Sequence, residues 1–519
     1  MKKIITLFTA LSLMASVHAQ SSNDFEMTGP DYISDFMDNF ISATGVSSNG
    51  QYVFGAMVGG EGPAAFYDII GGEPAVMFEP ECEESFGVTI AGITYDNIIF
   101  VSENDIVYTY DIANGTKTYI TSPDAVLGLD VWDVTSDGMV IAGNLTDSES
   151  VVCKPMYGIK QADGTYKITA LDFDSKDVFG MESQFTQARF LTDDGNNIIG
   201  VQIDARGRAP RLVVWEKQED GSFKFLTPMD ETIYDFSAGK PGKKPEFEDF
   251  VTADPETERD LYDQQKAEFN EAFMAYETAF AAFTRNGSTL DVFKMHRGKR
   301  NNIIYAGYNT EDGTYPILYN CDTNETTAYP DLMGYAFEDL PGGGMITFDD
   351  TTGLCSLNAV SEDGTETMFT EWLKDKTGMD ISPLYSIEMT NPMTGMTIEG
   401  VFPGLPFFSH DGKTLALSGI NSNFEYETGV YTFDRDIFAA LATGIGVNVV
   451  SEVTFGHNTL NIGAGKNAVA EVYTMNGMLC GSYNVSGTVC FDGMLAAGTY
   501  IVKVSSEGAQ PVSMKIMVK

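Results

Sequence analysis

Short runs of apolar residues, each preceded by a glycine turn, recur along most of the chain. The phrase TSDGMVIAG occupies Thr135–Gly143, and similar phrases occupy Ser47–Gly55, Thr192–Gly200 and Ser409–Gly419. In each phrase, Asp-Gly or Asn-Gly supplies the positive φ of a tight hairpin turn. The run that follows is rich in β-branched or aromatic residues, which is typical of a short buried strand. The phrase therefore predicts antiparallel strands joined by hairpins.

Each phrase opens a longer unit. After Thr192–Gly200 the chain continues with a proline, an aromatic-bearing strand, a second glycine turn and a final strand. Looser copies begin near Gly92, Asn301 and Gly342, which gives seven units of about 40 to 55 residues each. A small sheet cannot bury both of its faces alone, whereas a ring of such sheets buries all but the outer edges. The chain is therefore expected to be all-β, with a β-propeller of about seven antiparallel blades at 20–443.

A helical pattern interrupts these units at about 240–287. Pro255 and Asn286-Gly287 stand where a helix would start and stop. Between them, aromatic residues recur at helical spacing: Phe269, Phe273, Tyr276, Phe280 and Phe283. This stripe predicts a helix packed against the outside or rim of the propeller, and a partner-binding helix is the alternative. Basic residues gather on both sides of the insertion, where we expect them to neutralise neighbouring carboxylates.

Residues just before the phrases are the candidates for a ligand site. In a propeller they lie on the strand nearest the central channel, and Trp132 beside acidic residues could stack on a sugar ring. A tryptophan packed between blades is the alternative interpretation. The candidate ligand-binding residues at the channel mouth are Thr44, Asp130, Trp132, Gln187 and Arg189.

The last 74 residues follow a different strand pattern, and 446–519 is expected to form a small β-sandwich. The segments VYTMNG at Val472–Gly477 and LAAGTYIVKV at Leu495–Val504 are followed by a short terminal strand at Lys515–Lys519. In order and position these resemble the C-terminal sorting domain of type IX secretion in Bacteroidota, although the Pro-Asn-Pro usual near the start of that domain is missing. The resemblance implies export across the outer membrane with the type IX machinery as partner. An ordinary adhesive sandwich is the alternative.

The propeller units also resemble those of secreted bacterial propellers whose blades read S-x-D-G-x-x-I-x-G. That resemblance implies a fold more than a function. It agrees with the N-terminus, where two lysines, an apolar run of about a dozen residues and Val17-His18-Ala19 form a signal peptide over 1–19. Cleavage is expected between Ala19 and Gln20. The chain is therefore predicted to be exported through the periplasm and to be extracellular or on the outer cell surface.

Charge limits the possible partners. The formal net charge is −43 at pH 7, which disfavours nucleic acid as a partner because phosphate backbones are repelled. No segment after the signal peptide is long and apolar enough to be expected to span a membrane. Six cysteines are present in a chain expected to be exported, where disulfides are permitted. Cys480 and Cys490 flank a predicted hairpin, so a disulfide between them is possible.

No catalytic motif stands out in the sequence. A GxSxG nucleophile elbow is missing, and GxxxxGK[ST] is missing as well. Beyond the signal peptide the histidines are His296, His410 and His457, too scattered along the chain to indicate a triad or a histidine-rich metal site. With 74 Asp and Glu residues, many carboxylate pairs will occur by chance. The sequence therefore favours a protein that is not an enzyme.

No cofactor is predicted. Oxygen ligands alternate in two segments that could bind Ca²⁺, but neither segment has the glycine at position six of an EF-type loop. Hairpin turns are the favoured interpretation of both. The residues are Asp172, Asp174 and Asp177 in one segment and Asn320, Asp322 and Asn324 in the other.

Taken as a sequence, the chain is expected to be an exported β-propeller that binds a protein or a glycan. One alternative is a propeller-type carbohydrate-active hydrolase or lyase that uses channel carboxylates. Another is a structural component of a surface layer.

Overall fold

The computed structural model describes twenty-three segments of the chain, and the predicted signal peptide, with Ala19 and Gln20, lies outside them. They are residues 27–33, 41–57, 62–81, 87–103, 106–122, 127–146, 154–204, 208–285, 287–298, 300, 302–349, 356–390, 397–401, 403–421, 426–442, 454–456, 459–461, 467–474, 479–486, 488–491, 494–496, 498–506 and 512–518. The chain divides into two compact units, Met1–Asp436 and Ile437–Lys519.

Seven four-stranded antiparallel sheets make up the first unit, which confirms the predicted fold class. The first three sheets are β2 (Ile41–Val46), β3 (Tyr52–Met57), β4 (Ala64–Asp68) and β5 (Val76–Phe78); β6 (Thr89–Ile93), β7 (Ile98–Glu103), β8 (Ile106–Asp111) and β9 (Thr116–Ile120); and β10 (Gly128–Val134), β11 (Val140–Thr146), β12 (Lys154–Lys160) and β13 (Tyr166–Ala170). The next three are β14 (Phe185–Leu191), β15 (Asn197–Ile203), β16 (Arg211–Lys217) and β17 (Phe223–Leu226); β18 (Thr289–Arg297), β19 (Ile303–Asn309), β20 (Thr314–Asn320) and β21 (Glu325–Ala328); and β22 (Tyr335–Asp339), β23 (Met345–Asp349), β24 (Ser356–Val360) and β25 (Glu366–Met368).

The seventh sheet joins the two ends of the unit. It consists of β28 (Pro403–Phe408), β29 (Thr414–Ile420), β30 (Tyr426–Phe433) and, as its outer strand, β1 (Met27–Tyr32). Each sheet contacts the next along the chain, and the seventh contacts the first through β2, β28 and β29. The sheets therefore close into a ring of seven blades, as the repeat predicts. From the first blade through the sixth, and again between the seventh and the first, the first strands of neighbouring blades contact one another, which places them on the inside of the ring.

The first strand of every blade carries a β-bulge or similar irregularity. In β10 the register shifts between Val131 and Asp133, and in β14 it shifts between Ala188 and Phe190. The extra residue at such a shift leaves the alternation between the two sheet faces, which re-aims its side chain. On the innermost strand of a blade, the side chain of this extra residue is directed towards the channel.

The last glycine of the repeated phrase makes these bulges possible. A Cβ on Gly143 would lie 1.9 Å from the carbonyl oxygen of Asp130, and a Cβ on Gly200 would lie 2.0 Å from that of Gln187. Both glycines stand on the second strand of a blade, opposite the residue that precedes the bulge. The phrase therefore encodes a close approach of the first strand as well as a turn.

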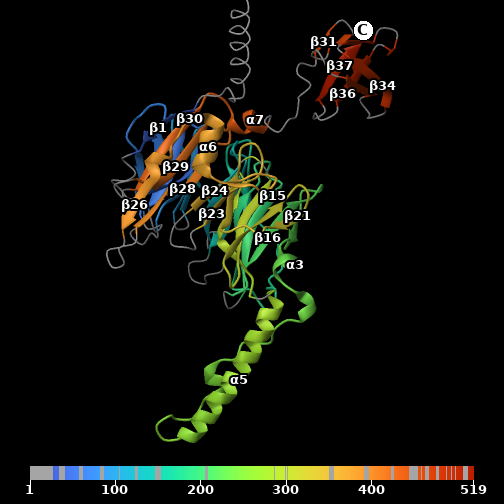
Figure 1. Ribbon diagram of the computed structural model, residues 1–519. Helices are drawn as coiled ribbons and strands as arrows, with labels where there is room; N and C mark the ends of the chain where they lie inside the picture. The colour runs from blue at the N-terminus through green and yellow to red at the C-terminus, as the bar shows by residue number, and fades with distance from the viewer. Residues whose placement is uncertain are drawn as a thin grey trace, which may run out of the picture. The chain divides into compact units, whose positions relative to one another are not determined.

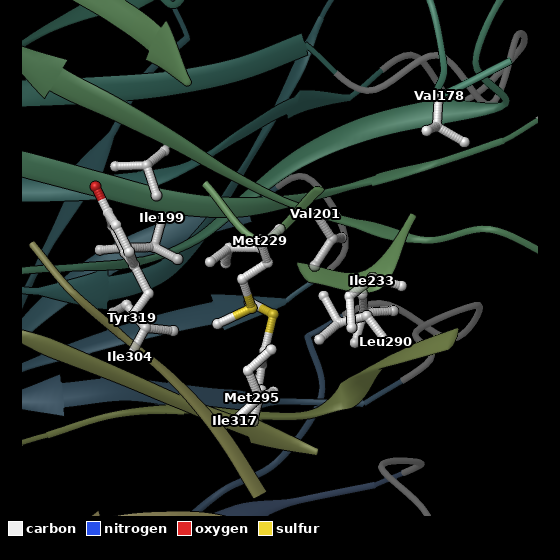
Figure 2. Close-up of a cluster of buried hydrophobic side chains, with 14 of the residues drawn as sticks. Val178, Ile199, Val201, Met229, Ile233, Leu290, Met295, Ile304, Ile317 and Tyr319 are labelled. Atoms are coloured by element: carbon white, nitrogen blue, oxygen red, sulfur yellow. The ribbon is translucent and has the colours of Figure 1, made fainter. Parts of the chain in front are cut away.

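Packing between blades is illustrated by a cluster of buried hydrophobic side chains around the fourth and fifth sheets (Figure 2). Val201 of β15 and Ile304 of β19 belong to it, with Met229 and Met295 at its centre in the figure. In β18 the register shifts between Asp291 and His296. Leu290, just before the shift, and Met295, at its end, are both buried in this cluster, so the core fixes the strand on either side of the irregular part. Burial of such side chains stabilises each by roughly 1.5–3 kcal/mol.

The helical insertion connects the fourth and fifth blades. Its helices are α3 (Asp230–Ile233), η1 (Phe236–Ala238), α4 (Phe247–Phe250) and α5 (Arg259–Phe283), and α5 extends away from the sheets (Figure 1). The helix starts at Arg259 and not at Pro255, because Asp254 instead organises a turn: its side chain accepts from the Glu256 N–H at 2.8 Å and its carbonyl from the Glu258 N–H at 2.8 Å.

The aromatic stripe of α5 packs against two different partners. Phe280 and Phe283 lie 5.9 and 5.4 Å from the ring of Phe179, on the propeller. Farther from the propeller, Phe269 packs against Phe247 of α4 at 5.3 Å. The predicted packing on the propeller thus holds for the C-terminal part of the stripe, while α4 covers part of the remainder.

Other elements of the first unit lie between the sixth and seventh blades. They are α6 (Phe369–Thr377), η2 (Ser382–Tyr385) and a hairpin of β26 (Ser386–Thr390) and β27 (Thr397–Val401).

The second unit is a small β-sandwich. It contains α7 (Ile437–Ala442), a sheet of β31 (Thr454–Gly456), β32 (Thr459–Asn461) and β35 (Thr488–Cys490), and a sheet of β33 (Asn467–Thr474), β34 (Leu479–Ser486), β36 (Gly498–Ser506) and β37 (Val512–Val518). Leu460 and Phe491 from the first sheet region pack with Val472, Val502 and Val504 of the second. The predicted boundary between residues 443 and 446 lies outside the described residues.

The geometry assumed for Cys480 and Cys490 is wrong. Cys480 lies on β34 in the four-stranded sheet, whereas Cys490 lies on β35, which pairs with β32 opposite Thr459. The two cysteines therefore do not face each other across a hairpin, because β34 and β35 belong to different sheets. A disulfide between them stays a prediction without that support.

Candidate ligand site in the propeller channel

The candidate residues all lie on first strands, next to the channel. Thr44 stands at the bulge of β2 and is exposed, but the whole second blade separates it from β10. Trp132 and Arg189 stand at the bulges of β10 and β14, each two residues after a second candidate, Asp130 or Gln187. The structure brings Trp132, Asp130 and Arg189 together.

The carboxylate of Asp130 holds the indole of Trp132. Trp132 Nε1 donates to Asp130 Oδ2 at 2.5 Å, and the Ser102 hydroxyl, on β7, donates to Oδ1 at 2.5 Å. The Ser102 hydroxyl also accepts from the Val131 N–H at 3.2 Å. Asp130 is thus held by residues of the second and third blades, and through its hydrogen bond to Nε1 it fixes the orientation of the indole. The side chain of Trp132 nevertheless remains 43% exposed.

Arg189 lies between two aromatic rings. The carbon at the centre of its guanidinium is 5.4 Å from the ring of Trp132 and 5.6 Å from the ring of Phe293, distances at which a cation is attracted to the ring face. Its Nη1 donates to the carbonyl of Val292 at 2.8 Å. Burial lowers the pKa of Arg189.

The guanidinium of Arg189 is not saturated by the protein. Nε is buried and has no hydrogen-bond partner among the residues that the structure describes. An arginine carries five N–H donors, and within the described residues the bond to Val292 is the one that Arg189 makes. The side chain thus places a positive charge, with its hydrogen-bonding capacity only partly used, beside two exposed aromatic rings.

Phe293 completes the site and was not predicted. In β18, Asp291 pairs with Gly307 and His296 pairs with Tyr305, so four residues, 292–295, stand opposite one. Val292 and Met295 remain in the core while Phe293 is 80% exposed. The lost alternation in TLDVFKMHR is the sequence signal, but the fifth unit has no Asp-Gly phrase to align it with the others.

An ion pair crosses the channel close to this site. Arg297, on β18, donates from Nε to Asp133 Oδ2 at 2.6 Å and from Nη2 to Oδ1 at 3.2 Å. Asp133 lies on β10, so the pair joins the third and fifth blades past the fourth. Burial alone would lower the pKa of Arg297, but the carboxylates around it, Asp133 first and then Asp193 and Glu338, together raise the pKa.

Contacts between turns also cross the ring at this end. The hydroxyl of Tyr95, in the second blade, lies 2.5 Å from Nδ1 of His410 in the seventh. His410 Nε2 lies 3.5 Å from Asp193 Oδ2 in the fourth blade, and Asp193 Oδ1 accepts from the Ser136 N–H at 2.6 Å. A cavity of about 30 Å³ remains beside Asp133, Arg297 and His410, room for about one water molecule. The end of the channel formed by the repeated phrases is thus crossed by polar contacts.

A larger groove, of about 420 Å³, lies between the second and third blades. Three of its four carboxylates accept hydrogen bonds within their own turns: Asp111 from Asn114, Asp137 from Thr135 and Asp163 from Thr165. Because these acceptors are already used locally, the groove is a weaker candidate than the channel.

Both segments considered for Ca²⁺ form turns. Asp177 Oδ1 accepts from the N–H groups of Phe179 and Met181 at 2.9 and 2.8 Å, and Asp174 Oδ1 accepts from the Lys176 N–H at 2.9 Å. Asn320 Oδ1 accepts from the Asp322 N–H at 2.9 Å in the β20–β21 hairpin, which contains Asn324. Within the described residues, no group of three His, Cys, Asp or Glu side chains is placed to hold a metal ion.

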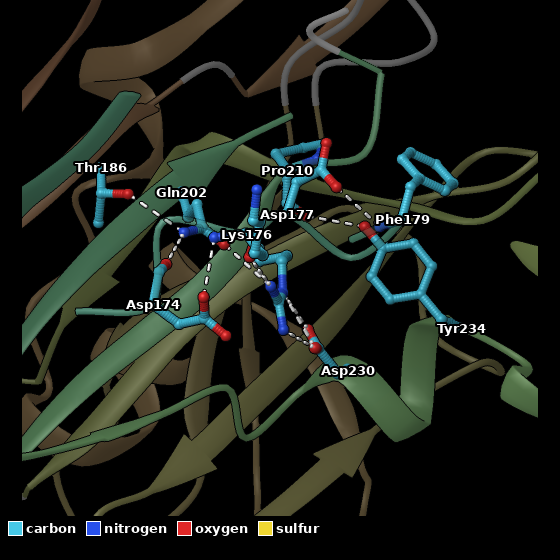
Figure 3. A network of polar contacts seen from close by, with 10 residues as sticks. Asp174, Lys176, Asp177, Phe179, Thr186, Gln202, Pro210, Asp230 and Tyr234 are labelled. Carbon is cyan, nitrogen blue, oxygen red and sulfur yellow. Dashed lines mark hydrogen bonds and ion pairs between the residues drawn. The ribbon is translucent and has the colours of Figure 1, made fainter. Parts of the chain in front are cut away.

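The Asp174 segment is tied to the blade behind it (Figure 3). Gln202 Nε2 donates to the Asp174 carbonyl at 2.7 Å, and its Oε1 accepts from Arg211 at 2.9 Å. Arg211 also forms a buried ion pair with Asp230 at 2.5 Å. Asp230 and Arg211 thus satisfy one another and hold the entry to the helical insertion, at α3.

Comparisons with known proteins give structural similarities but no family. No family model matches the chain, and no curated protein matches it. It is similar in structure to an oligogalacturonate lyase in complex with manganese, at a TM-score of 0.41 and 10% identity over 80% of this chain and 92% of that one. It is also similar to the Dos1 propeller, at a TM-score of 0.39 and 8% identity over 80% and 96% of the two chains.

A third similar structure is a virginiamycin B lyase from Staphylococcus aureus, at a TM-score of 0.37 and 12% identity over 79% of this chain and 99% of that one. The described part of the chain contains no helix that is both long and apolar enough for a membrane span.

Proposed function

We propose that this chain is an exported binding protein that holds its ligand in the propeller channel, at Trp132, Arg189 and Phe293. The observation that carries the proposal is the pairing of two exposed aromatic rings with an arginine that meets one backbone carbonyl and whose Nε has no hydrogen-bond partner among the described residues. Large apolar groups placed around a few polar ones are typical of ligand sites. The ligand is a glycan or a segment of a protein.

Binding is favoured over acid–base catalysis by the state of the channel carboxylates. Asp133 is bound to Arg297, and Asp130 accepts from Trp132 and Ser102. A glycosidase needs two carboxyl groups facing the scissile bond, and both of these groups are committed to neighbouring side chains.

The test is a screen of the protein against a glycan library and against proteins of the cell surface, with Trp132→Ala beside it. We expect binding that the substitution reduces about fivefold or more, since a stacking ring at the centre of a site contributes about 1–3 kcal/mol or more. Phe293→Ala is the second variant, because an exposed side chain can be removed without unfolding the propeller. Binding that both variants leave unchanged would contradict the channel site.

Export by type IX secretion is proposed for the second unit. It is supported by the motif segments, which fall on adjacent strands of one sheet: Val472 on β33, Gly498–Val504 on β36 and Lys515 on β37. Deleting 446–519 is expected to trap the protein in the periplasm, as detected by fractionation of cells and medium. Continued export of the shortened chain would contradict this proposal.

A further inference from the structure

The charge of Arg189 narrows the class of ligand. Other arginines of the described chain meet carboxylates: Arg297 meets Asp133, and Arg211 meets Asp230. Arg189 instead faces aromatic rings and one backbone carbonyl, in a protein with a formal net charge of −43. Removing a charge from water without a partner is unfavourable, so such a group is usually paired or neutralised. A ligand that supplies the missing anion would satisfy it.

The geometry of the site suits a ligand that carries one anionic group attached to a ring. Trp132 and Phe293 cover the guanidinium from their ring faces, while Val292 takes one donor of Nη1. The remaining donors lie in the guanidinium plane, which is the arrangement that binds a planar carboxylate through two parallel hydrogen bonds. A ring attached to that carboxylate would lie against the exposed aromatic surface.

A polyanion fits this site less well. Asp130 stands two residues from Trp132 and is bonded to its indole, and Asp133 lies beyond the bulge. A second negative charge on the ligand would face these carboxylates and be repelled. The contacts of Asp133 with Arg297, and of His410 with Asp193, also cross the ring near the site. A ligand that ends there is favoured over a polymer that passes through.

We infer that the channel site recognises a carboxylate carried on a sugar or aromatic ring at the end of its ligand, with Arg189 as the residue that selects the acid over its neutral analogue. This inference rests on the proposed channel function and adds the chemical class of ligand. Trp132 and Phe293 supply affinity for the ring in either analogue. Arg189 supplies the preference for the charged one.

The test uses matched acid and amide probes. D-glucuronate and D-glucuronamide form one pair, and benzoate and benzamide form another. Binding is followed by calorimetry, which also reports on Trp132→Ala. Tryptophan fluorescence is the second readout in the chains that keep Trp132, because Trp132 is exposed while Trp215 and Trp372 are buried. The acid of one or both pairs is expected to bind about tenfold or more tightly than its amide, since hydrogen bonds to charged groups contribute about 1.5–3 kcal/mol.

Variants separate the charge from the rings. Arg189→Gln is expected to bring acid and amide to within about threefold of one another, and raising the salt concentration should weaken only the acid. Arg189→Lys should retain part of the preference because it keeps the charge and loses the fork. The matched control is Arg285→Gln, because Arg285 is exposed and donates to the Glu231 carbonyl, outside the propeller channel. Thermal unfolding of each variant is measured first.

The outcomes distinguish the two proposals. If ligands from the panels or the glycan library bind through Trp132 and Phe293 without preference for the acid, the carboxylate inference is overturned and the channel function stands. An acid preference that survives in Arg189→Gln would overturn the role of Arg189. If none of the probes and library members binds in a way that depends on Trp132 or Phe293, both proposals fail.

Discussion

Arg297 and Arg189 lie on neighbouring inner strands, β18 and β14, but have opposite surroundings. Arg297 and its partner Asp133 are each 9% exposed at the side chain and share two hydrogen bonds across the channel. Arg189 lies between aromatic rings with a buried Nε that has no hydrogen-bond partner among the described residues. The pKa shifts follow: the carboxylates around Arg297 raise its pKa, whereas burial lowers the pKa of Arg189. The charge of Arg297 is satisfied within the protein and links two blades, whereas the charge of Arg189 meets no carboxylate among the described residues, and we propose that a ligand supplies one.

The largest expected effect comes from breaking the satisfied pair. Arg297→Met leaves the Asp133 carboxylate buried with its backbone donors, the N–H groups of Val134 and Leu191, but without its cation. The free energy of unfolding is expected to fall by about 3–5 kcal/mol, measured by denaturant unfolding. Arg285→Met is the control on an exposed arginine, and a loss as small as the control's would show that the pair is not structural.

A smaller loss is expected when a bulge is prevented. Gly200→Ala places a Cβ 2.0 Å from the Gln187 carbonyl oxygen, so β14 must move. We expect a loss of about 1–3 kcal/mol and weaker ligand binding, because Arg189 stands at that bulge. Gly242→Ala is the matched control, since a Cβ there meets nothing within 4 Å. Equal unfolding midpoints for the two variants would contradict the close approach.

Replacing Arg189 should change the stability of the protein less than replacing Arg297. Arg189→Met is expected to alter the free energy of unfolding by less than about 1 kcal/mol, because a desolvated charge disappears along with its stacking contacts. The same variant should lose its preference for acids. A destabilisation equal to that of Arg297→Met would mean that Arg189 also serves the fold, and the comparison would collapse.

A third arginine gives a pH-dependent test at the base of the helical insertion. Arg208 donates to Glu277 of α5 at 2.8 and 3.1 Å, and this bond lowers the pKa of the Glu277 carboxyl. A carboxyl whose pKa is lower in the folded state stabilises it above its ordinary pKa, and that contribution is lost as the pH falls. We expect amide hydrogen exchange in α5, corrected for the intrinsic rate, to rise between about pH 5 and pH 3. In Arg208→Met the exchange should already be fast at pH 7.

Much of the fold could be predicted because its signals are local. A glycine turn and the apolar run after it are read within nine residues, as in Thr135–Gly143, and the repeat of that phrase identifies the blades. The same alignment led to Trp132 and Arg189, which stand at equivalent bulges. Their contact follows from the adjacency of the third and fourth blades.

The rest of the site depends on contacts that no local pattern records. Asp133 and Arg297 are 164 residues apart, and nothing near Asp133 distinguishes it from the candidate Asp130. Phe293 belongs to the blade that follows the helical insertion, where the phrase is lost and four residues stand opposite one. Which of several nearby charges is satisfied is decided across the ring, and so only the three-dimensional structure separates the two arginines.

The closure of the seventh blade has a consequence for the order of assembly. The hydroxyls of Thr28 and Thr432 lie 2.7 Å apart although 404 residues separate them. Until β30 has been made and positioned, β1 has no partner and the ring cannot shut, so its completion is a late, non-local step in folding. A chain that lacks Met27–Tyr32 would expose one edge of β30, and such an edge can recruit a strand from a second molecule. A few residues near the N-terminus thus decide whether the ring closes on itself or on a neighbour.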